Sequence, residues 1–227
     1  MSSVLRQTAG RIQRQSLHYW RRFIATDTTD GELEMIESVL SLGACDWIVE
    51  VGANDPFTGS MSWPLIHRGW KAILVEPHPA AFKRLRREYQ NNSRVSLVNK
   101  ACSDQNGQLP LIIGSDGDWG SLSTLCTDDN PILNQRRTNN SIAVDVVRLE
   151  ELLNEHNLPK HFGVLSVDTE GMDYEVLQGL NLSVFTPKLV ITEDYAPKDM
   201  AKYKILEEAG YILLGKCNAN SVWQNIR

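Results

Sequence analysis

Residues 46–77, DWIVEVGANDPFTGSMSWPLIHRGWKAILVEP, contain the pattern that decides the fold. Two short apolar runs, 46–52 and 71–77, flank a segment, 60–68, that we expect to be a helix ended by Gly69. Continuous apolar runs of this length are typical of strands that are buried on both faces of a sheet. A strand, a helix and a second strand in this order predict parallel pairing of the two strands.

The same alternation continues along the chain. We expect strands over residues 94–102, 161–168 and 187–194, and helices over residues 30–42, 79–90, 149–157, 172–180 and 197–209. Two final runs, 211–217 and 221–226, predict a hairpin. The sequence therefore predicts an α/β fold with a mostly parallel, Rossmann-like sheet, an antiparallel C-terminal hairpin and helices on both faces.

Residues 103–141 interrupt this alternation, because they are rich in Gly, Pro, Asp, Asn and Ser. The runs 109–114 and 141–148 predict two extra strands that pair around a long loop. A loop of this length in a compact domain is usually either functional or disordered. We expect one domain over residues 45–227 that contains this insertion, with residues 1–44 packed on it as a helical segment.

The composition limits the classes of protein to which the chain can belong. Its 227 residues, 42% of them apolar, are enough for one domain with a substantial core. The net charge of -5 argues against nucleic-acid binding, and no apolar run reaches the roughly 18 residues of a transmembrane helix. The four cysteines have no zinc-site spacing and the chain starts without a secretory signal, so we expect buried thiols in a reducing, cytoplasmic environment.

Residues 1–26 form a basic segment, with five arginines and no acidic residue. Its apolar residues recur at helical spacing, which predicts an amphipathic helix. Such a helix covers an edge of the domain, contacts a membrane surface or binds a partner, a second copy of the chain in a homo-oligomer included. A cleaved organelle transit peptide is a further alternative.

Polar residues stand where the first two predicted strands end. Glu50, Gly52 and Asn54 close the first strand, and Glu76 with Pro77 closes the second. Ligands of open parallel sheets bind outside the carboxyl ends of the strands. Gly52 lets a ligand approach the backbone closely, and a carboxylate at Glu76 can accept both hydroxyls of a ribose.

Phosphate-binding motifs are missing from the sequence. A dinucleotide fingerprint needs three glycines, but Asn54 stands where the second one belongs, and there is no phosphate-binding loop of the G-x-x-x-x-G-K-[ST] type. The two strand ends therefore predict a ribose-bearing ligand without phosphates. S-adenosylmethionine, which joins adenosine to a sulfonium and an amino-acid tail, meets this description.

Seven short motifs together resemble the FkbM-type methyltransferases. In chain order they are EVGANDPFTG (50–59), ILVEPHP (73–79), NKACSD (99–104), GSLSTL (120–125), VDVVRLEELL (144–153), LSVDTEGMDYEVLQGL (165–180) and VITED (190–194). The most specific of them is SVDTEGMDYEVLQG. The resemblance implies a class I methyltransferase fold, S-adenosylmethionine as the methyl donor and, usually, a hydroxyl acceptor on a sugar or a polyketide-type natural product.

The resemblance also implies roles for single residues. Glu50, Gly52 and Asn54 would hold the amino-acid end of the cofactor, and Glu76 its ribose. The other residues expected at the cofactor are Pro77, Ala101, Cys102, Ser103 and, in the insertion, Ser121 and Ser123. Pro56 stands where the family usually has Gly, and since proline restricts the backbone, the path of this loop stays open.

Further acids follow the fourth and fifth strands of the predicted sheet. These are Asp168 and Glu170 after one strand and Glu193 at the end of the next. A sugar hydroxyl is a poor nucleophile, so its methylation needs a base or a metal. Asp168 and Glu170 are candidate bases with Glu193 as a helper, and the three carboxylates are also candidate ligands of Mg²⁺. Glu170 has the alternative of capping the helix that follows it.

The sequence thus predicts an S-adenosylmethionine-dependent O-methyltransferase that acts on a hydroxyl of a sugar, glycan or glycosylated natural product. Two alternatives remain open. One is N- or carboxyl-methylation on the same fold, with Arg136 and Arg137 facing an acceptor carboxylate. The other is a non-catalytic module of methyltransferase type that binds a ligand or partner.

Overall fold

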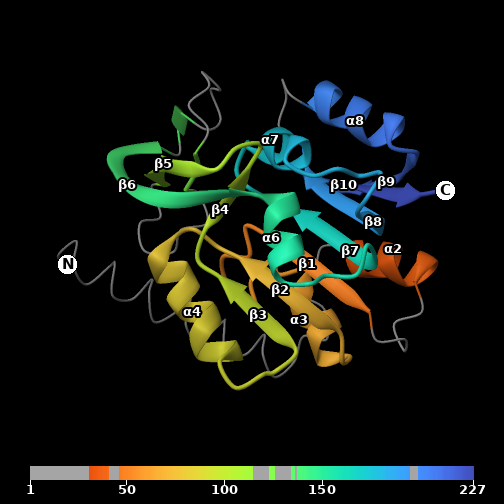
Figure 1. The fold of residues 1–227 in the computed structure, drawn as a ribbon, viewed down its shortest axis with the longest axis horizontal. Helices are drawn as coiled ribbons and strands as arrows, with labels where there is room; N and C mark the ends of the chain where they lie inside the picture. Colours follow the sequence, from red (N-terminus) through yellow and green to blue (C-terminus); the bar gives the residue numbers. More distant parts are fainter. Residues whose placement is uncertain (1–30, 41–45, 115–122, 126–133, 136, 195–198) are drawn as a thin grey trace, which may run out of the picture.

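The computed structural model of the protein gives the fold in Figure 1. It describes residues 31–40, 46–114, 123–125, 134–135, 137–194 and 199–227. The basic segment, residues 1–26, and the predicted site residue Ser121 lie outside these ranges. No helix within them is long and apolar enough to cross a membrane.

A seven-stranded sheet forms the centre of the protein. Its strands are β1 (Trp47–Val51), β2 (Lys71–Val75), β3 (Val95–Val98), β7 (His161–Val167), β8 (Thr186–Glu193), β9 (Tyr211–Cys217) and β10 (Asn220–Asn225). Their order is β3-β2-β1-β7-β8-β10-β9. Neighbouring strands from β3 to β8 in this order are parallel, whereas β10 runs antiparallel to both β8 and β9. The predicted mostly parallel sheet with a terminal antiparallel hairpin is confirmed.

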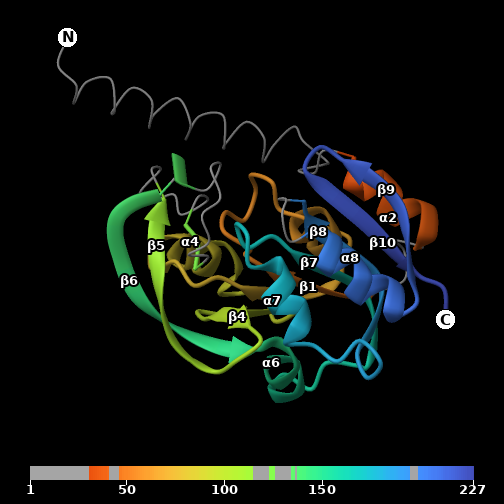
Figure 2. The ribbon, with the colours of Figure 1, turned by 90° about the horizontal axis from the view of Figure 1, so that it is seen from above.

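Helices cover both faces of this sheet (Figure 2). One face carries α2 (Glu32–Val39), α3 (Ser62–His67) and α4 (Pro79–Tyr89), and the other carries α6 (Leu149–Glu155), α7 (Asp173–Gln178) and α8 (Asp199–Glu208). Successive strand residues point to opposite faces, so Ile48 packs on the α2–α4 side and Val49 on the α6–α8 side. This double burial explains why β1 and β2 are continuous apolar runs.

The insertion adds a second, three-stranded sheet at one side of the molecule (Figure 2). It consists of β4 (Ala101–Ser103), β5 (Gly107–Gly114) and β6 (Arg137–Arg148), in the order β4-β6-β5. The predicted pairing of the two extra strands is confirmed and is antiparallel, although β6 begins at Arg137 rather than at residue 141. An isolated bridge from Thr124 to Ile112 ties part of the intervening loop to β5.

The single strand predicted over residues 94–102 is wrong. β3 ends at Val98, and the chain then crosses to the second sheet as β4. The side chain of Asn99 causes the break, because its Nδ2 donates to the carbonyls of Glu76 (2.8 Å) and Pro77 (3.2 Å) at the end of β2. These bonds bring the start of β4 to the carboxyl edge of the central sheet.

The helices are also somewhat shorter than predicted. The helix expected over residues 30–42 ends at Val39, since Leu40 is already extended, with φ −114° and ψ 134°. The helix expected over residues 60–68 comprises only Ser62–His67. Fraying and capping at helix ends are governed by local contacts that periodicity does not report.

Candidate active site

A cleft of about 210 Å³ opens at the carboxyl ends of β1, β2 and β7. It lies where the strand order reverses, since β2 and β3 follow β1 on one side while β7 and β8 lie on the other. This is the position at which open α/β sheets bind their ligands. The loop after β1, the start of β4, the loop after β7 and residues of the insertion form its walls.

The loop after β1 touches the loop after β7 at Gly52. A Cβ atom at this position would lie only 1.7 Å from the carbonyl oxygen of Asp168, and Gly52 has a positive φ of 86°. The N–H groups of Gly52 and Ala53 both donate to the carbonyl of Val75 at the end of β2. Glycine is therefore required here to bring three strand ends together around the cleft.

Glu50 lines the cleft and is almost fully buried. Its carboxylate accepts hydrogen bonds from the N–H groups of Met61 (2.8 Å) and Ser62 (3.3 Å) and from the hydroxyl of Ser60 (3.4 Å). Burial raises the pKa of Glu50 to about 7, against the effect of these bonds. Glu50 thus holds the segment that enters α3, an attachment that the sequence did not predict.

Glu76 occupies the equivalent place at the tip of β2 and also lines the cleft. One oxygen accepts from the N–H of Asn54 (2.8 Å) and the other from the N–H of His78 (2.6 Å). Burial raises its pKa to about 7, although both backbone bonds favour the ionised form. A carboxylate held by two backbone groups in this way keeps a fixed orientation, which suits the recognition of a pair of hydroxyls.

Asn54 has a left-handed backbone conformation, with a φ of 39°, which asparagine tolerates better than most residues. Asn54 lines the cleft, but its side-chain oxygen accepts a hydrogen bond from Arg84 of α4 (3.0 Å). Arg84 also forms an ion pair with Asp55 (3.3 Å), whose carboxylate accepts from the N–H groups of Phe57 and Thr58. The loop that contains Pro56 is therefore a turn closed by Asp55, which points away from the cleft lining.

Three further residues expected at the cofactor line the cleft: Pro77, Ala101 and Cys102. Burial raises the pKa of the Cys102 thiol to about 12, so these three side chains are uncharged. Ser103, which was also expected at the cofactor, is not part of the lining. Its hydroxyl donates to Asp104, and its carbonyl packs against Gly179, where an added Cβ would lie 2.1 Å from the oxygen.

The acids after β7 and β8 converge at the edge of the cleft. One carboxylate oxygen from each of Asp168, Glu170 and Glu193 lies within 4.8 Å of the other two. Asp168 and Glu170 line the cleft, whereas Glu193 lies next to them outside the lining. Burial, then the nearby charges of Asp168 and Glu170, raise the pKa of Glu193 far above its ordinary value.

The loop that presents these acids has an unusual backbone. Glu170 and Gly171 both adopt positive φ, 51° and 100°. The hydroxyl of Thr124, a buried residue of the insertion, donates to the carbonyl of Glu170 (2.6 Å). A non-glycine residue with positive φ persists where its surroundings hold it, so the insertion helps to fix the orientation of Glu170.

Several cleft residues were not predicted from the sequence. Besides Ser123, which was predicted, the lining includes Thr58, Lys100, Leu111, Leu125, Ser166, Thr169, Met172 and Asn220. Ser166 pairs in register with Glu50 in the parallel β1–β7 ladder, so strand alternation could have placed it on the same face. Asn220 has no such signal, because it reaches the cleft only when β10 inserts beside β8.

The residues present fit S-adenosylmethionine. The buried Glu76 carboxylate matches a ribose, the uncharged wall at Ala101 and Cys102 matches an adenine ring, and the acids at the edge match a positively charged sulfonium. No phosphate-binding glycine loop is present in the sequence. Together with the strand order and the antiparallel β10, these features define a class I methyltransferase.

Residues 50–213 match the family described as the methyltransferase FkbM domain, which is more than half of the chain. The chain therefore belongs to the FkbM methyltransferase family, as its motifs predicted. No curated protein matches the sequence.

Solved structures show the same fold. The chain is similar to the methyltransferase FkbM from Methylobacillus flagellatus, with a TM-score of 0.51 and 12% identity over 79% of this chain and 43% of that one. It is also similar to monomeric WbdD, with a TM-score of 0.50 and 13% identity over 91% of this chain and 43% of that one. The chain thus spans less than half the length of either relative.

Proposed function

We propose that the enzyme transfers a methyl group from S-adenosylmethionine to a hydroxyl of a sugar, a glycan or a glycosylated natural product. The observation that carries this proposal is the convergence of Asp168, Glu170 and Glu193 at the edge of a cleft shaped for a phosphate-free nucleoside. When bound, the cofactor supplies an electrophilic methyl group on a sulfonium. The chain must then orient the acceptor oxygen and remove its proton.

The cofactor roles that we propose follow the cleft geometry. Glu76 would accept the ribose hydroxyls, and Ala101 and Cys102 would border the adenine. The backbone after β1, from Gly52 to Asn54, would approach the amino-acid end, while Glu50 shapes this wall by holding the start of α3. Ser121 stays a prediction, since it lies outside the described residues.

Asp168 is the base in this proposal. Its carboxylate is the exposed member of the cluster, while Glu193 has a strongly raised pKa and is protonated at neutral pH. Two neighbouring acids whose pKa values are pushed apart can divide the roles of proton donor and acceptor. Glu193 would donate a hydrogen bond that orients Asp168. Asp168 would take the acceptor proton as the new C–O bond forms and the bond between the methyl carbon and the sulfonium sulfur breaks, which leaves the sulfur as a neutral thioether.

The charge of the cluster also supports a neutral acceptor. An acceptor carboxylate would be repelled by the carboxylates of Asp168 and Glu170, which lie within 4.8 Å of each other. The arginine pair that carboxyl methylation would need is not supported, because Arg137 donates to Asn134 (2.7 Å) and lies outside the cleft lining, and Arg136 lies outside the described residues. An amine acceptor is compatible with the negative charge of the cluster. The experiment below distinguishes amine from hydroxyl methylation.

The experiment is a comparison of matched acceptors. The purified enzyme is incubated with isotopically labelled S-adenosylmethionine and neutral sugars, their amino-sugar analogues and their uronic-acid analogues, and the products are analysed by mass spectrometry. We expect labelled methyl ethers of the neutral sugars. Methylation confined to the amino sugars or to the uronic acids would contradict the hydroxyl assignment.

Removal of divalent metal separates the two possible roles of the acidic cluster. The same three oxygens are of the type that Mg²⁺ prefers, but their use as base and donor needs no metal. We therefore expect the methylation rate to change by less than about twofold after chelator treatment and Mg²⁺ add-back. Loss of activity with chelator and its recovery with Mg²⁺ would assign the cluster to a metal instead.

We also propose a cytoplasmic location. Among the described cysteines, Cys102 is a buried free thiol, which is usual in a reducing compartment. The proposal that residues 1–26 contact a membrane surface or a second copy of the chain is tested by deleting them and measuring vesicle binding and molecular mass in solution. A deletion that changes neither quantity contradicts it.

A further inference from the structure

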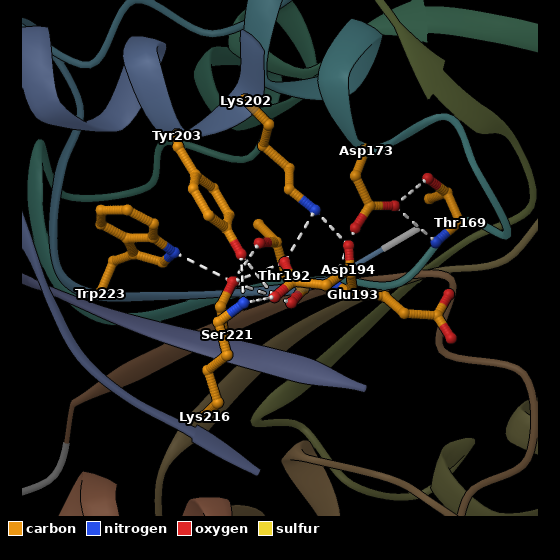
Figure 3. A network of polar contacts seen from close by, with 10 residues as sticks. All are labelled: Thr169, Asp173, Thr192, Glu193, Asp194, Lys202, Tyr203, Lys216, Ser221 and Trp223. Atoms are coloured by element: carbon orange, nitrogen blue, oxygen red, sulfur yellow. Dashed lines mark hydrogen bonds and ion pairs between the residues drawn. The ribbon is translucent and has the colours of Figure 1, made fainter. Parts of the chain in front are cut away.

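Asp173 is a buried acid that the proposed chemistry does not use. It lies in the first turn of α7 and is only 4% exposed. One carboxylate oxygen accepts hydrogen bonds from both the N–H (2.9 Å) and the hydroxyl (2.6 Å) of Thr169, and the other accepts from the N–H of Glu193 (2.9 Å) (Figure 3). A single side chain thus contacts two different strand ends.

These strand ends carry the acidic cluster. Thr169 stands between Asp168 and Glu170 after β7, and Glu193 is the last residue of β8. The parallel ladder between the two strands ends at the pair Val167 and Thr192. Asp173 therefore links the segments that follow β7 and β8, one or two residues beyond the last backbone pair of the two strands.

Glu193 is held from a second side by Lys202 of α8. The Nζ of Lys202 donates to the carbonyl of Glu193 and forms an ion pair with Asp194 (3.4 Å) (Figure 3). Lys202 is itself almost fully buried. Both backbone polar groups of Glu193 are thus bound by ionisable side chains from neighbouring helices.

We propose that Asp173 is a positioning residue, which sets the distance between the Asp168–Glu170 loop and Glu193 so that the three carboxylates converge on the acceptor. This inference rests on the proposed function. The three bonds to Asp173 fix the backbone on each side of the cluster, and errors of a fraction of an ångström in such a site lower the rate of reaction strongly. Asp173 acts through these backbone groups and lies outside the cleft lining.

The variant Asp173→Asn tests this role. Asparagine has the same size, but it has one acceptor oxygen and its NH₂ group can only donate, so it cannot accept from both Thr169 and Glu193. We expect kcat to fall by about tenfold or more, while the KM for the acceptor and the Kd for S-adenosylmethionine change by less than about threefold. A variant with wild-type kcat, or one that loses cofactor affinity in proportion to kcat, contradicts the proposal.

Asp194→Asn is the matched control. Asp194 also contacts Lys202, but its other hydrogen bonds go to Tyr203, Lys216 and Ser221. We expect this variant to lower the midpoint of thermal unfolding and to keep kcat within about threefold of the wild type. An equal loss of kcat in both variants would mean that any damage to the end of β8 is sufficient, and would overturn the specific role of Asp173.

A second pair of variants keeps the test valid if Asp173→Asn does not fold. Thr169→Val removes only the hydroxyl bond to Asp173, and Thr169→Ser restores a hydroxyl. We expect kcat to fall about fivefold with valine and to recover with serine. Full activity of Thr169→Val, or the same loss with serine, contradicts the proposal.

The kinetic measurements use whichever acceptor the wild-type enzyme methylates. If that acceptor is an amine or a carboxylate, the proposed hydroxyl chemistry is wrong, but the comparison of Asp173, Asp194 and Thr169 variants still decides whether Asp173 positions the cluster. The two proposals therefore fail independently.

Discussion

Glu50 and Glu76 each hold a neighbouring loop and line the cleft. Each stands at the tip of a parallel strand, accepts hydrogen bonds from the backbone of a neighbouring loop and presents part of its carboxylate to the cleft. Because both are buried, the free protein holds them with a pKa of about 7. Their charge is therefore costly for the fold and useful for binding hydroxyl or ammonium groups.

This cost predicts how stability depends on pH. In the unfolded chain Glu50 and Glu76 ionise near their ordinary pKa of 4.5, whereas in the folded protein they keep their protons up to about pH 7. The folded state binds more protons in this window, so their contribution to stability is full below pH 4.5 and is lost as the pH rises through 7. Thermal unfolding of Glu76→Gln should depend less on pH in this window than that of the wild type. Equal slopes would show that Glu76 ionises normally in the fold.

Gly52 is the single backbone position on which the contact between the β1 and β7 loops depends. An alanine Cβ would overlap the carbonyl of Asp168 and would also have to adopt a positive φ. We expect Gly52→Ala to lower the free energy of unfolding by about 3 kcal/mol or more, measured with denaturant. Gly59→Ala is the control, since Gly59 also has positive φ but no atom within 4 Å of the added Cβ, and it should cost only about 1 kcal/mol. Equal costs would contradict the proposed close contact.

The strands and helices around the site were largely predictable because they repeat one physical pattern. The strands that end in Glu50, Glu76 and Glu193 are apolar runs buried between two helix layers, and their ends fall at one edge of the sheet. The break after β3 was not predictable, since it depends on hydrogen bonds from Asn99 to residues 22 and 23 positions away. Periodicity reports burial and contains no information about such pairs.

The same limit explains which site contacts were missed. Arg84 lies on α4 and contacts Asn54, which is 30 positions away in the sequence. The role of Asp173 was not predicted because it lies in the first turn of α7, where the helix dipole alone explains an acidic residue. Only the three-dimensional arrangement shows that its carboxylate reaches Thr169 and Glu193.

The insertion contacts the loop that contains Asp168 and Glu170 through Thr124. Its hydroxyl bond to the carbonyl of Glu170 joins the acceptor side of the cleft to the acidic cluster. We expect Thr124→Val to lower kcat/KM for the acceptor about fivefold, which corresponds to about 1 kcal/mol for one buried hydrogen bond. Thr138→Val removes a similar bond, to the carbonyl of Ile113 within the second sheet, and should leave kcat/KM unchanged. The opposite ranking of the two variants would show that the insertion does not act through Glu170.

The protein as a whole combines the seven-stranded central sheet with the three-stranded second sheet at its side (Figures 1 and 2). The central sheet supplies Glu50, Glu76, Asp168 and Glu193, and the second sheet with its loop supplies Ala101, Cys102 and Ser123. The cofactor and the acceptor would thus be bound at the boundary of the two sheets.

The most direct test is the rate of methyl transfer by Asp168→Asn at saturating S-adenosylmethionine. Asparagine preserves the shape of this residue but cannot take the acceptor proton. We predict a rate roughly 10²- to 10⁴-fold below that of the wild type, with the Kd for the cofactor within about threefold. A variant that methylates the acceptor at the wild-type rate would contradict the assignment of the acidic cluster as the base.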